Sequence, residues 1–311
     1  MTKGDPTFVL VTGLGATSFL WNPVVREIVL RGYRALPVEL PGHGFDTVFL
    51  EGYGTPQDAE RFASSPSPLA GLILDAYADH TLDLVRRVAK HGPVTLVGHS
   101  LGGSTVTRVA NTAPDLVARM VYLSAYCCAA SPVVPAYAPT QLDPDSPLGR
   151  ARRMAFLGDP TSTGASRTNP RTSDPDVLAV QHALLMADLD SAYVPAVLAY
   201  ATQPDEPLQA ILADAQVNPK AWGRLPRTYI RTSHDEVIPL DVQDRMIAEA
   251  NRLTPANPFT VHTIAGSHFT PITHATEVAD ILTLARRLRD PDRQKVVDVA
   301  PVCHARRCTP P

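Results

Sequence analysis

The sequence has little of what marks a membrane, nucleic-acid-binding or disulfide-bonded protein. Its apolar runs are far shorter than the roughly 20 residues that span a bilayer. A formal net charge of −3 argues against nucleic-acid binding through bulk electrostatics. The four cysteines indicate no disulfide framework: Cys127 and Cys128 are adjacent and fit small buried thiols, while Cys303 and Cys308 lie in a polar tail with His304. A metal clip in that tail is a minor alternative.

The first residues also lack the apolar stretch of a secretory signal, since residues 1–6 lead directly into an expected strand. We therefore expect a cytoplasmic protein that binds neither membranes nor nucleic acid. Hydrophobic residues make up 44% of the 311 residues, enough to fill the core of one large α/β domain or two small ones. The sequence does not decide between a monomer and a homodimer.

The most informative motif is G-x-S-x-G at residues 98–102, with Ser100 at its centre. An apolar run precedes it and a helix-compatible segment follows, which is typical of a nucleophile elbow. Such an elbow is a sharp strand-to-helix turn that exposes the serine hydroxyl. Gly98 and Gly102 supply the small residues that are needed where strand and helix pass closely. We predict that Ser100 is a nucleophile; the alternative is a solvated serine in a glycine-rich turn.

Short apolar runs alternate with helical patterns along most of the chain. This alternation predicts the α/β class, with a six-stranded, mostly parallel sheet flanked by helices. The expected strands are residues 8–12, 33–40, 94–97, 119–125, 227–232 and 259–264. The expected helices are residues 22–31, 74–89, 101–113, 239–251 and 276–288.

A long irregular stretch at residues 126–224 breaks this alternation and holds two helical patches, near 147–157 and 174–190. Because it follows the strand after the nucleophile strand, it is expected above the carboxyl ends of the strands, where ligands bind in such sheets. The Pro- and Ser-rich loop at 41–72 either joins this region or packs at its edge. The expected division is a hydrolase-like core at 1–125 and 225–290, a helical cap or lid at 126–224 and a flexible tail at 291–311.

A serine hydroxyl needs a base to take its proton, and elbow enzymes place the acid and the base later in the chain. Two loops at carboxyl ends of expected strands carry candidates. We predict His268 as the base and Asp235 as the acid that orients its ring. The weaker alternatives for the base are His262, His274 and His99, and we interpret His99 as a packing residue. The weaker alternatives for the acid are Glu236 and Asp241.

A developing oxyanion needs two N–H donors. We predict the backbone N–H groups of Leu101, which follows the nucleophile, and of Leu14, in the loop after the first strand. Apolar walls for a substrate are expected from Phe19, Tyr126 and Phe269; core packing is an equal alternative for Phe19 and Tyr126.

Together these motifs resemble the α/β-hydrolase superfamily of serine esterase type. The matching segments are LVTGLG with Trp21, ELPGHG at 39–44, LVGHSLGG, the HDEVIP loop and GSH. The resemblance is nearest to the group of methylesterases and hydroxynitrile lyases and to related bacterial esterases. Thr12 stands where the family usually has histidine, and the lyases' threonine and lysine are Gly13 and Phe269 here. Cyanohydrin cleavage is therefore not expected.

The resemblance implies hydrolysis of a carboxylic ester or lactone through an acyl-enzyme, without a metal or organic cofactor. The expected substrate is a medium-sized, mostly apolar small molecule. Related enzymes that act on epoxides or haloalkanes use an aspartate nucleophile, which Ser100 argues against. Acyl transfer, perhydrolysis and C–C bond hydrolysis on the same residues stay open, as does a non-enzymatic small-molecule receptor.

Overall fold

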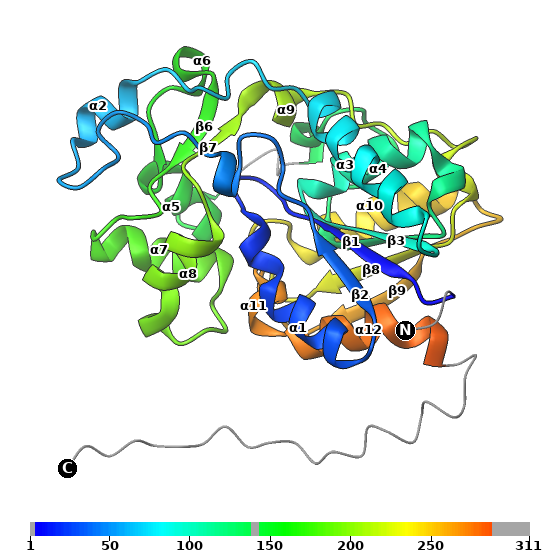
Figure 1. Ribbon diagram of the computed structural model, residues 1–311. Coiled ribbons are helices and arrows are strands. Elements are labelled where there is room, and N and C mark those ends of the chain that lie inside the picture. The colour runs from blue at the N-terminus through cyan, green and yellow to red at the C-terminus, as the bar shows by residue number, and fades with distance from the viewer. Residues whose placement is uncertain (1–3, 138–142, 288–311) are drawn as a thin grey trace, which may run out of the picture.

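A six-stranded sheet forms the centre of the computed structural model, which describes residues 4–137 and 143–287 (Figure 1). All neighbouring strands of this sheet pair in parallel, which confirms the predicted α/β sheet. Strands such as β1 are buried along their whole length, as expected when helices cover both faces. The strand order is β2 (Arg34–Pro37), β1 (Thr7–Val11), β3 (Val94–Ser100), β4 (Arg119–Ala125), β8 (Arg227–Thr232) and β9 (Thr260–Ile264).

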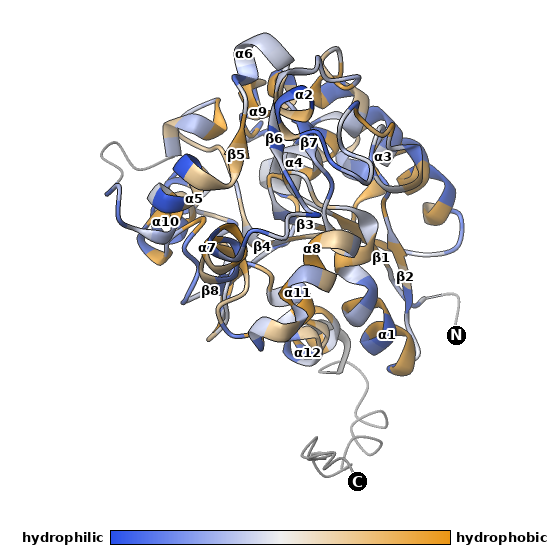
Figure 2. Ribbon diagram, turned by 90° about the vertical axis from the view of Figure 1, so that its left-hand side faces the viewer, coloured by the Kyte–Doolittle hydropathy of each residue, from blue (hydrophilic) through white to orange (hydrophobic). Residues whose placement is uncertain are grey.

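Helices cover both faces of the sheet (Figure 1). Each turns its apolar side to the strands, as Leu74, Ala78, Leu82 and Val85 do along α3. In Figure 2 the hydrophobic colour accordingly marks β1, while α1 carries both colours. On one face lie α1 (Asn22–Leu30) and α12 (Ala275–Arg287), preceded by η1 (Ser18–Trp21) and α11 (Thr270–Thr273); on the other lie α3 (Leu74–Ala89), α4 (Gly102–Thr112), η3 (Pro114–Leu116) and α10 (Leu240–Leu253).

The segment between β4 and β8, called the insertion below, holds short helices and a second sheet of three antiparallel strands. Two of its helices, α5 (Pro147–Met154) and α7 (Pro175–Leu185), match the predicted helical patches. The small sheet was not predicted, because strands of two to four residues show no periodicity. The elements are η4 (Val134–Tyr137), α5 (Pro147–Met154), β5 (Phe156–Leu157), α6 (Pro160–Thr163), β6 (Ala165–Thr168), α7 (Pro175–Leu185), η5 (Ser191–Tyr193), α8 (Val194–Ala201), β7 (Asp205–Pro207), α9 (Leu208–Leu212) and η6 (Trp222–Arg224).

Three helices of the insertion begin with one sequence signal. Ser146, Asp159 and Asp174 each accept a hydrogen bond from a backbone N–H of the first turn, and a proline follows each of them. A capping oxygen satisfies an N–H that the helix leaves unpaired, and proline suits the first helical position. These caps explain why helices form in a stretch so rich in proline and aspartate.

Residues 41–72 belong with the insertion and are not a plain loop. They form η2 (Gly44–Asp46) and α2 (Ala59–Ser64). The backbone N–H of Ser67 donates to the carbonyl oxygen of Thr163 at 2.8 Å. Arg167 donates to the carbonyl oxygen of Ser65 at 2.8 Å and pairs with Asp205 at 2.7 Å, fully buried. The loop left open by the sequence therefore joins the insertion.

Other sequence expectations concern membrane-spanning helices, the cysteines and the C-terminal tail. Within residues 4–137 and 143–287, no helix has the length and apolarity to cross a membrane. Cys127 and Cys128 are free and buried, in line with small buried thiols. The tail at 291–311, with Cys303, His304 and Cys308, lies outside the described residues.

Candidate active site

Ser100 stands at a sharp turn between β3 and α4. Its φ of 55° lies in the left-handed region, which non-glycine residues rarely adopt. A Cβ atom on Gly98 would lie 2.8 Å from the carbonyl oxygen of Gly102, and one on Gly102 would lie 2.4 Å from that of Thr12. Side chains at these positions would push strand and helix apart. The two glycines are thus required by the close approach that raises the serine above the sheet.

Ser100, His268 and Asp235 form one hydrogen-bonded chain at the carboxyl edge of the sheet. The hydroxyl of Ser100 lies 3.0 Å from Nε2 of His268, and Nδ1 of His268 lies 2.7 Å from Oδ2 of Asp235. Ser100 ends β3, while His268 and Asp235 follow β9 and β8, and the parallel arrangement of these strands brings their carboxyl ends to one edge. All three side chains are buried, with Ser100 only 5% exposed. The structure therefore brings together the three residues that the motifs had singled out.

Asp235 sits in a ring of hydrogen-bond donors. The backbone N–H groups of Val237 and Ile238 donate to Oδ1 at 2.8 and 2.9 Å, and the hydroxyl of Ser124 donates to Oδ2. Burial alone would raise the pKa of Asp235, but His268 and these donors outweigh it and hold that pKa below its ordinary value. The carboxylate thus stays charged beside the imidazole and fixes which ring nitrogen carries the proton.

The alternative acids and bases lie elsewhere. Glu236 and Asp241 are exposed, and the hydrogen bonds described for His268 do not include them. His262 lies within β9, and His274 pairs with Asp188 at 3.2 Å. None of these four side chains joins the Ser100 chain.

His99 has a role beyond packing that sequence reasoning missed. Its Nε2 donates to the backbone carbonyl oxygen of His268 at 2.9 Å, and the two rings lie 4.8 Å apart. Burial, together with the nearby His268, lowers the pKa of His99 to about 3. The His99 ring is therefore neutral near pH 7 and keeps one N–H for this contact. Its position before the nucleophile was the only signal in the sequence.

The two predicted oxyanion donors lie on adjoining segments. A turn from Gly13 to Ala16 carries Leu14 and is closed by a 3.1 Å hydrogen bond from the N–H of Ala16 to the carbonyl oxygen of Gly13. A Cβ atom on Gly13 would lie 2.9 Å from both the backbone nitrogen of Leu101 and the hydroxyl oxygen of Ser100. The turn thus lies directly against Ser100, and the role of the two N–H groups stays a prediction.

The predicted apolar walls occupy different environments. Phe19 is 39% exposed and its ring lies 5.9 Å from that of Phe45. Tyr126 is half-buried, and its backbone N–H donates to the carbonyl oxygen of Ser100 at 3.0 Å. Phe269 is buried between core and insertion beside Leu198. A substrate contact for these residues stays a prediction.

Two carboxylates of the insertion reach the site, and the sequence analysis missed both. Oε2 of Glu206 accepts from the N–H of Gly15 at 2.7 Å. Oδ2 of Asp188 accepts from the N–H of Ser267 at 3.1 Å, next to His268. Glu206 lies in the three-residue strand β7 and Asp188 in a turn, and segments so short carry no pattern that could have singled out either residue.

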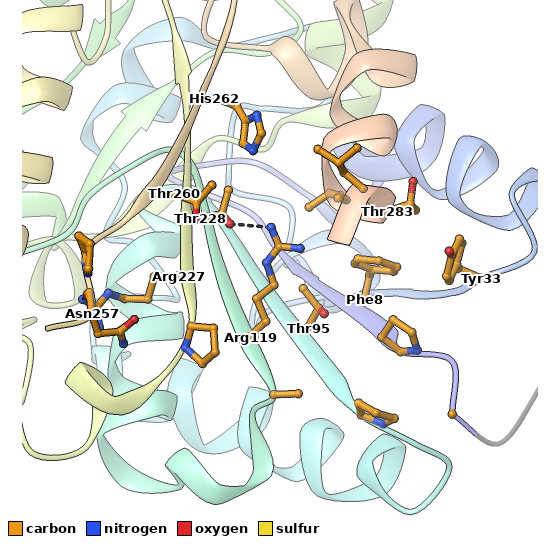
Figure 3. Close-up of a pocket in the computed structure, with 18 residues that line it drawn as sticks. Phe8, Tyr33, Thr95, Arg119, Arg227, Thr228, Asn257, Thr260, His262 and Thr283 are labelled. Atoms are coloured by element: carbon orange, nitrogen blue, oxygen red, sulfur yellow. Dashed lines mark hydrogen bonds between the residues drawn. The ribbon is translucent and has the colours of Figure 1, made fainter. Parts of the chain in front are cut away.

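Two cavities of the described residues differ in size and in distance from Ser100. A cavity of about 980 Å³ lies at the opposite edge of the sheet, beside Phe8, Arg119 and Thr228 (Figure 3). A cavity beside Leu101 measures only about 10 Å³, roughly the space of one water. Within the described ranges, no group of three or more His, Cys, Asp or Glu residues is placed to hold a metal ion.

Comparison with known proteins agrees with this arrangement. The model of the alpha/beta hydrolase family matches residues 8–281. The "Putative methylesterase 12, chloroplastic" of Arabidopsis thaliana is 23% identical over 264 residues, which are 85% of this chain and 66% of that protein. The (E)-2-((N-methylformamido)methylene)succinate hydrolase of Acinetobacter baylyi is 34% identical over 122 residues, 39% of this chain and 38% of that protein. The chain thus spans less than two thirds of these curated relatives.

Solved structures show the same fold over the whole length of the similar chains. A pyrethroid hydrolase from Sphingobium faniae JZ-2 is 22% identical with a TM-score of 0.65, covering 92% of this chain and 98% of that one. Polyneuridine aldehyde esterase is 17% identical with a TM-score of 0.67, covering 90% of this chain and 99% of that one.

Proposed function

The chain belongs to the alpha/beta hydrolase family, and on that premise we propose that it is a serine hydrolase of carboxylic esters or lactones. The observation that carries the proposal is the continuous chain from the Ser100 hydroxyl through His268 to Asp235. A buried nucleophile, base and orienting acid in hydrogen-bond contact are the parts that acyl transfer to serine needs. The similar proteins described as methylesterase, esterase and pyrethroid hydrolase support an ester as the bond cleaved.

The reaction would proceed through an acyl-enzyme. His268 takes the proton of Ser100 while the serine oxygen bonds to the ester carbonyl carbon, and the carbonyl oxygen becomes an oxyanion. The imidazolium gives that proton to the leaving alcohol as its C–O bond breaks. Water then adds to the acyl carbon, losing a proton to His268, which returns it to Ser100 as the acid leaves. Asp235 stabilises the imidazolium in both halves.

The oxyanion of both tetrahedral intermediates would be held by the backbone N–H groups of Leu14 and Leu101. Leu101 precedes the first turn of α4, where unpaired N–H groups and the helix dipole favour negative charge. Losing one such donor typically slows an enzyme about 10² to 10³-fold. No organic cofactor or metal has a step in this scheme.

We propose further that the insertion acts as a cap. It contacts the Gly13–Ala16 turn and the loop that carries His268, and Ser100 is almost completely covered. A substrate therefore reaches the serine only when residues of the cap or the rim move aside. Leu14 and Phe19, each more than a third exposed, offer apolar surface near the turn, which suits a medium-sized, mostly apolar ester.

The first test is hydrolysis of p-nitrophenyl acetate and butyrate by the wild type and by Ser100→Ala, with both folds checked by circular dichroism. We expect turnover by the wild type and a loss of about a thousandfold or more in the variant. Equal rates in both proteins would remove Ser100 from the mechanism. Absence of turnover by a folded wild type would favour a receptor over an enzyme of small esters.

A further inference from the structure

A stretch of the insertion runs alongside the turn that carries Leu14. The N–H of Thr17 donates to the carbonyl oxygen of Ala201 at 2.9 Å, and the N–H of Gln203 donates to that of Gly15 at 2.8 Å. Ala16 and Thr202 form an antiparallel bridge between them. The backbone of the insertion is thus docked on the turn beside the nucleophile.

Glu206 ends this stretch and places a carboxylate inside the protein. Its Oε2 accepts from the N–H of Gly15 at 2.7 Å and lies 3.2 Å from Nε2 of His43, while its Oε1 accepts from the hydroxyl of Tyr77 at 3.0 Å. The residue is only 1% exposed. A buried carboxylate is stable only when donors surround it. Here they come from the turn, from the loop after β2 and from α3.

The hydrogen bonds in this cluster favour the charged form of His43. The second ring nitrogen of His43 lies 3.1 Å from the carbonyl oxygen of Pro41, so only the imidazolium donates to both acceptors. Burial lowers the pKa of His43, but the carboxylate of Glu206 outweighs it, and the net shift is upward. Burial and the same carboxylate raise the pKa of Tyr77, so its hydroxyl stays a donor. Glu206 thus accepts from Nε2 of His43, the hydroxyl of Tyr77 and the N–H of Gly15.

The contact to Gly15 selects one shape of the turn. Gly15 has φ +58°, a conformation in which side chains are strained. The peptide group between Leu14 and Gly15 is the central one of the turn, and rotation of such a group interconverts turn types. An acceptor at 2.7 Å holds the N–H of Gly15 toward the insertion and disfavours that rotation. The neighbouring Gly13 lies so close to Ser100 that a Cβ atom on it would be 2.9 Å from the serine hydroxyl oxygen, so a change in the turn would reach the reacting centre.

We propose that Glu206 is a positioning residue for the oxyanion: the insertion supplies it, and it holds the Gly13–Ala16 turn in its working shape. The inference rests on the proposed ester hydrolysis. It makes the insertion part of the machinery as well as its cover, because displacing Glu206 from Gly15 would release the turn.

The test compares Glu206→Leu with Glu206→Gln. Leucine fills similar space but accepts no hydrogen bond, whereas glutamine keeps an oxygen that can accept from Gly15. Both acylation and deacylation pass through an oxyanion, so both slow together and KM stays within about twofold. We expect kcat for p-nitrophenyl acetate to fall about tenfold to a hundredfold in Glu206→Leu and less than about fivefold in Glu206→Gln. Inactivation by a p-nitrophenyl alkylphosphonate, whose phosphoryl oxygen takes the oxyanion position, should slow in the same order.

The matched control is Asp205→Asn. Asp205 precedes Glu206 in the chain, and this variant weakens its buried ion pair with Arg167. It should lower the melting temperature and leave kcat within about twofold. The proposal is overturned if Glu206→Leu keeps wild-type kcat, if Asp205→Asn loses as much kcat, or if KM alone rises. Where Glu206→Leu does not fold, Tyr77→Phe removes one donor to the carboxylate and should lower kcat about threefold at constant KM; an unchanged kcat would overturn the proposal. A wild type that hydrolyses no ester refutes the proposed function, while phosphonate labelling of Ser100 still tests Glu206.

Discussion

Nε2 of His99 donates a hydrogen bond to the backbone carbonyl oxygen of His268 at 2.9 Å, so the residue before Ser100 anchors the loop that carries His268. The contact is buried and its donor is neutral, which makes it independent of pH near neutrality. It ties the end of β3 to the loop after β9 across the width of two intervening strands. The distance between Ser100 and His268 therefore depends on a buried side chain outside the Ser100–His268–Asp235 chain.

Removing this donor should slow the reaction. In His99→Leu the carbonyl oxygen of His268 is left buried without its partner, at a loss of about 1 to 3 kcal/mol in the free energy of unfolding. We expect kcat to fall about tenfold, because a misplaced base retards proton transfer. His99→Gln retains an N–H donor and should keep most of kcat. Steady-state kinetics and urea denaturation measure both; equal kcat values in the two variants would contradict the assigned role.

His99 should also make the protein sensitive to acid. Its pKa is lowered from 6.5 to about 3 on folding, so the unfolded chain binds a proton that the folded protein excludes. Stability from this group is complete above pH 6.5 and is lost as the pH falls toward 3, at up to about 1.4 kcal/mol per pH unit. Between pH 7 and pH 5, His99→Gln should therefore gain about 2 kcal/mol relative to the wild type. Urea titrations at both pH values check this, and parallel pH dependence in the two proteins would exclude it.

Asp235 and its neighbour Glu236 provide a matched pair. Asp235→Asn keeps the size of the side chain but removes the charge that fixes the His268 tautomer, and kcat should fall about 10³ to 10⁴-fold. Glu236→Gln changes an exposed side chain and should leave kcat within about twofold. The comparison uses p-nitrophenyl butyrate at pH 7.5. A large loss in Glu236→Gln with a small one in Asp235→Asn would exchange their roles.

Asp188 should support the base loop from the insertion. Both the N–H and the hydroxyl of Ser267 donate to its carboxylate, and His274 pairs with it at 3.2 Å. In Asp188→Ala we expect kcat to fall about tenfold, because the residue before His268 loses its anchor. Asp190→Ala removes a capping carboxylate of the same loop and should lower stability by about 1 kcal/mol without lowering kcat. Equal kcat in both variants would make Asp188 a stability residue only.

Much of the core could be predicted because its signals are local. The apolar run of β1, the glycines around Ser100 and the proline that opens α1 each act through neighbouring residues or through backbone geometry. The small sheet of the insertion escaped prediction because β7 consists of Asp205, Glu206 and Pro207, which favour loops elsewhere. Burial and pairing with β6 impose the strand there.

The sequence by itself determined the six-stranded α/β core and the elbow with Ser100, and it narrowed the base and the acid to a few candidates led by His268 and Asp235, since each depends on short-range pattern and chain order. Only the tertiary structure decided which carboxylate meets His268, that residues 41–72 join the insertion, and that Glu206 and His99 hold the two loops of the site. These contacts join residues between 33 and 191 positions apart. A buried hydrogen bond at such separation depends on where the whole fold places its ends, and no local pattern records it.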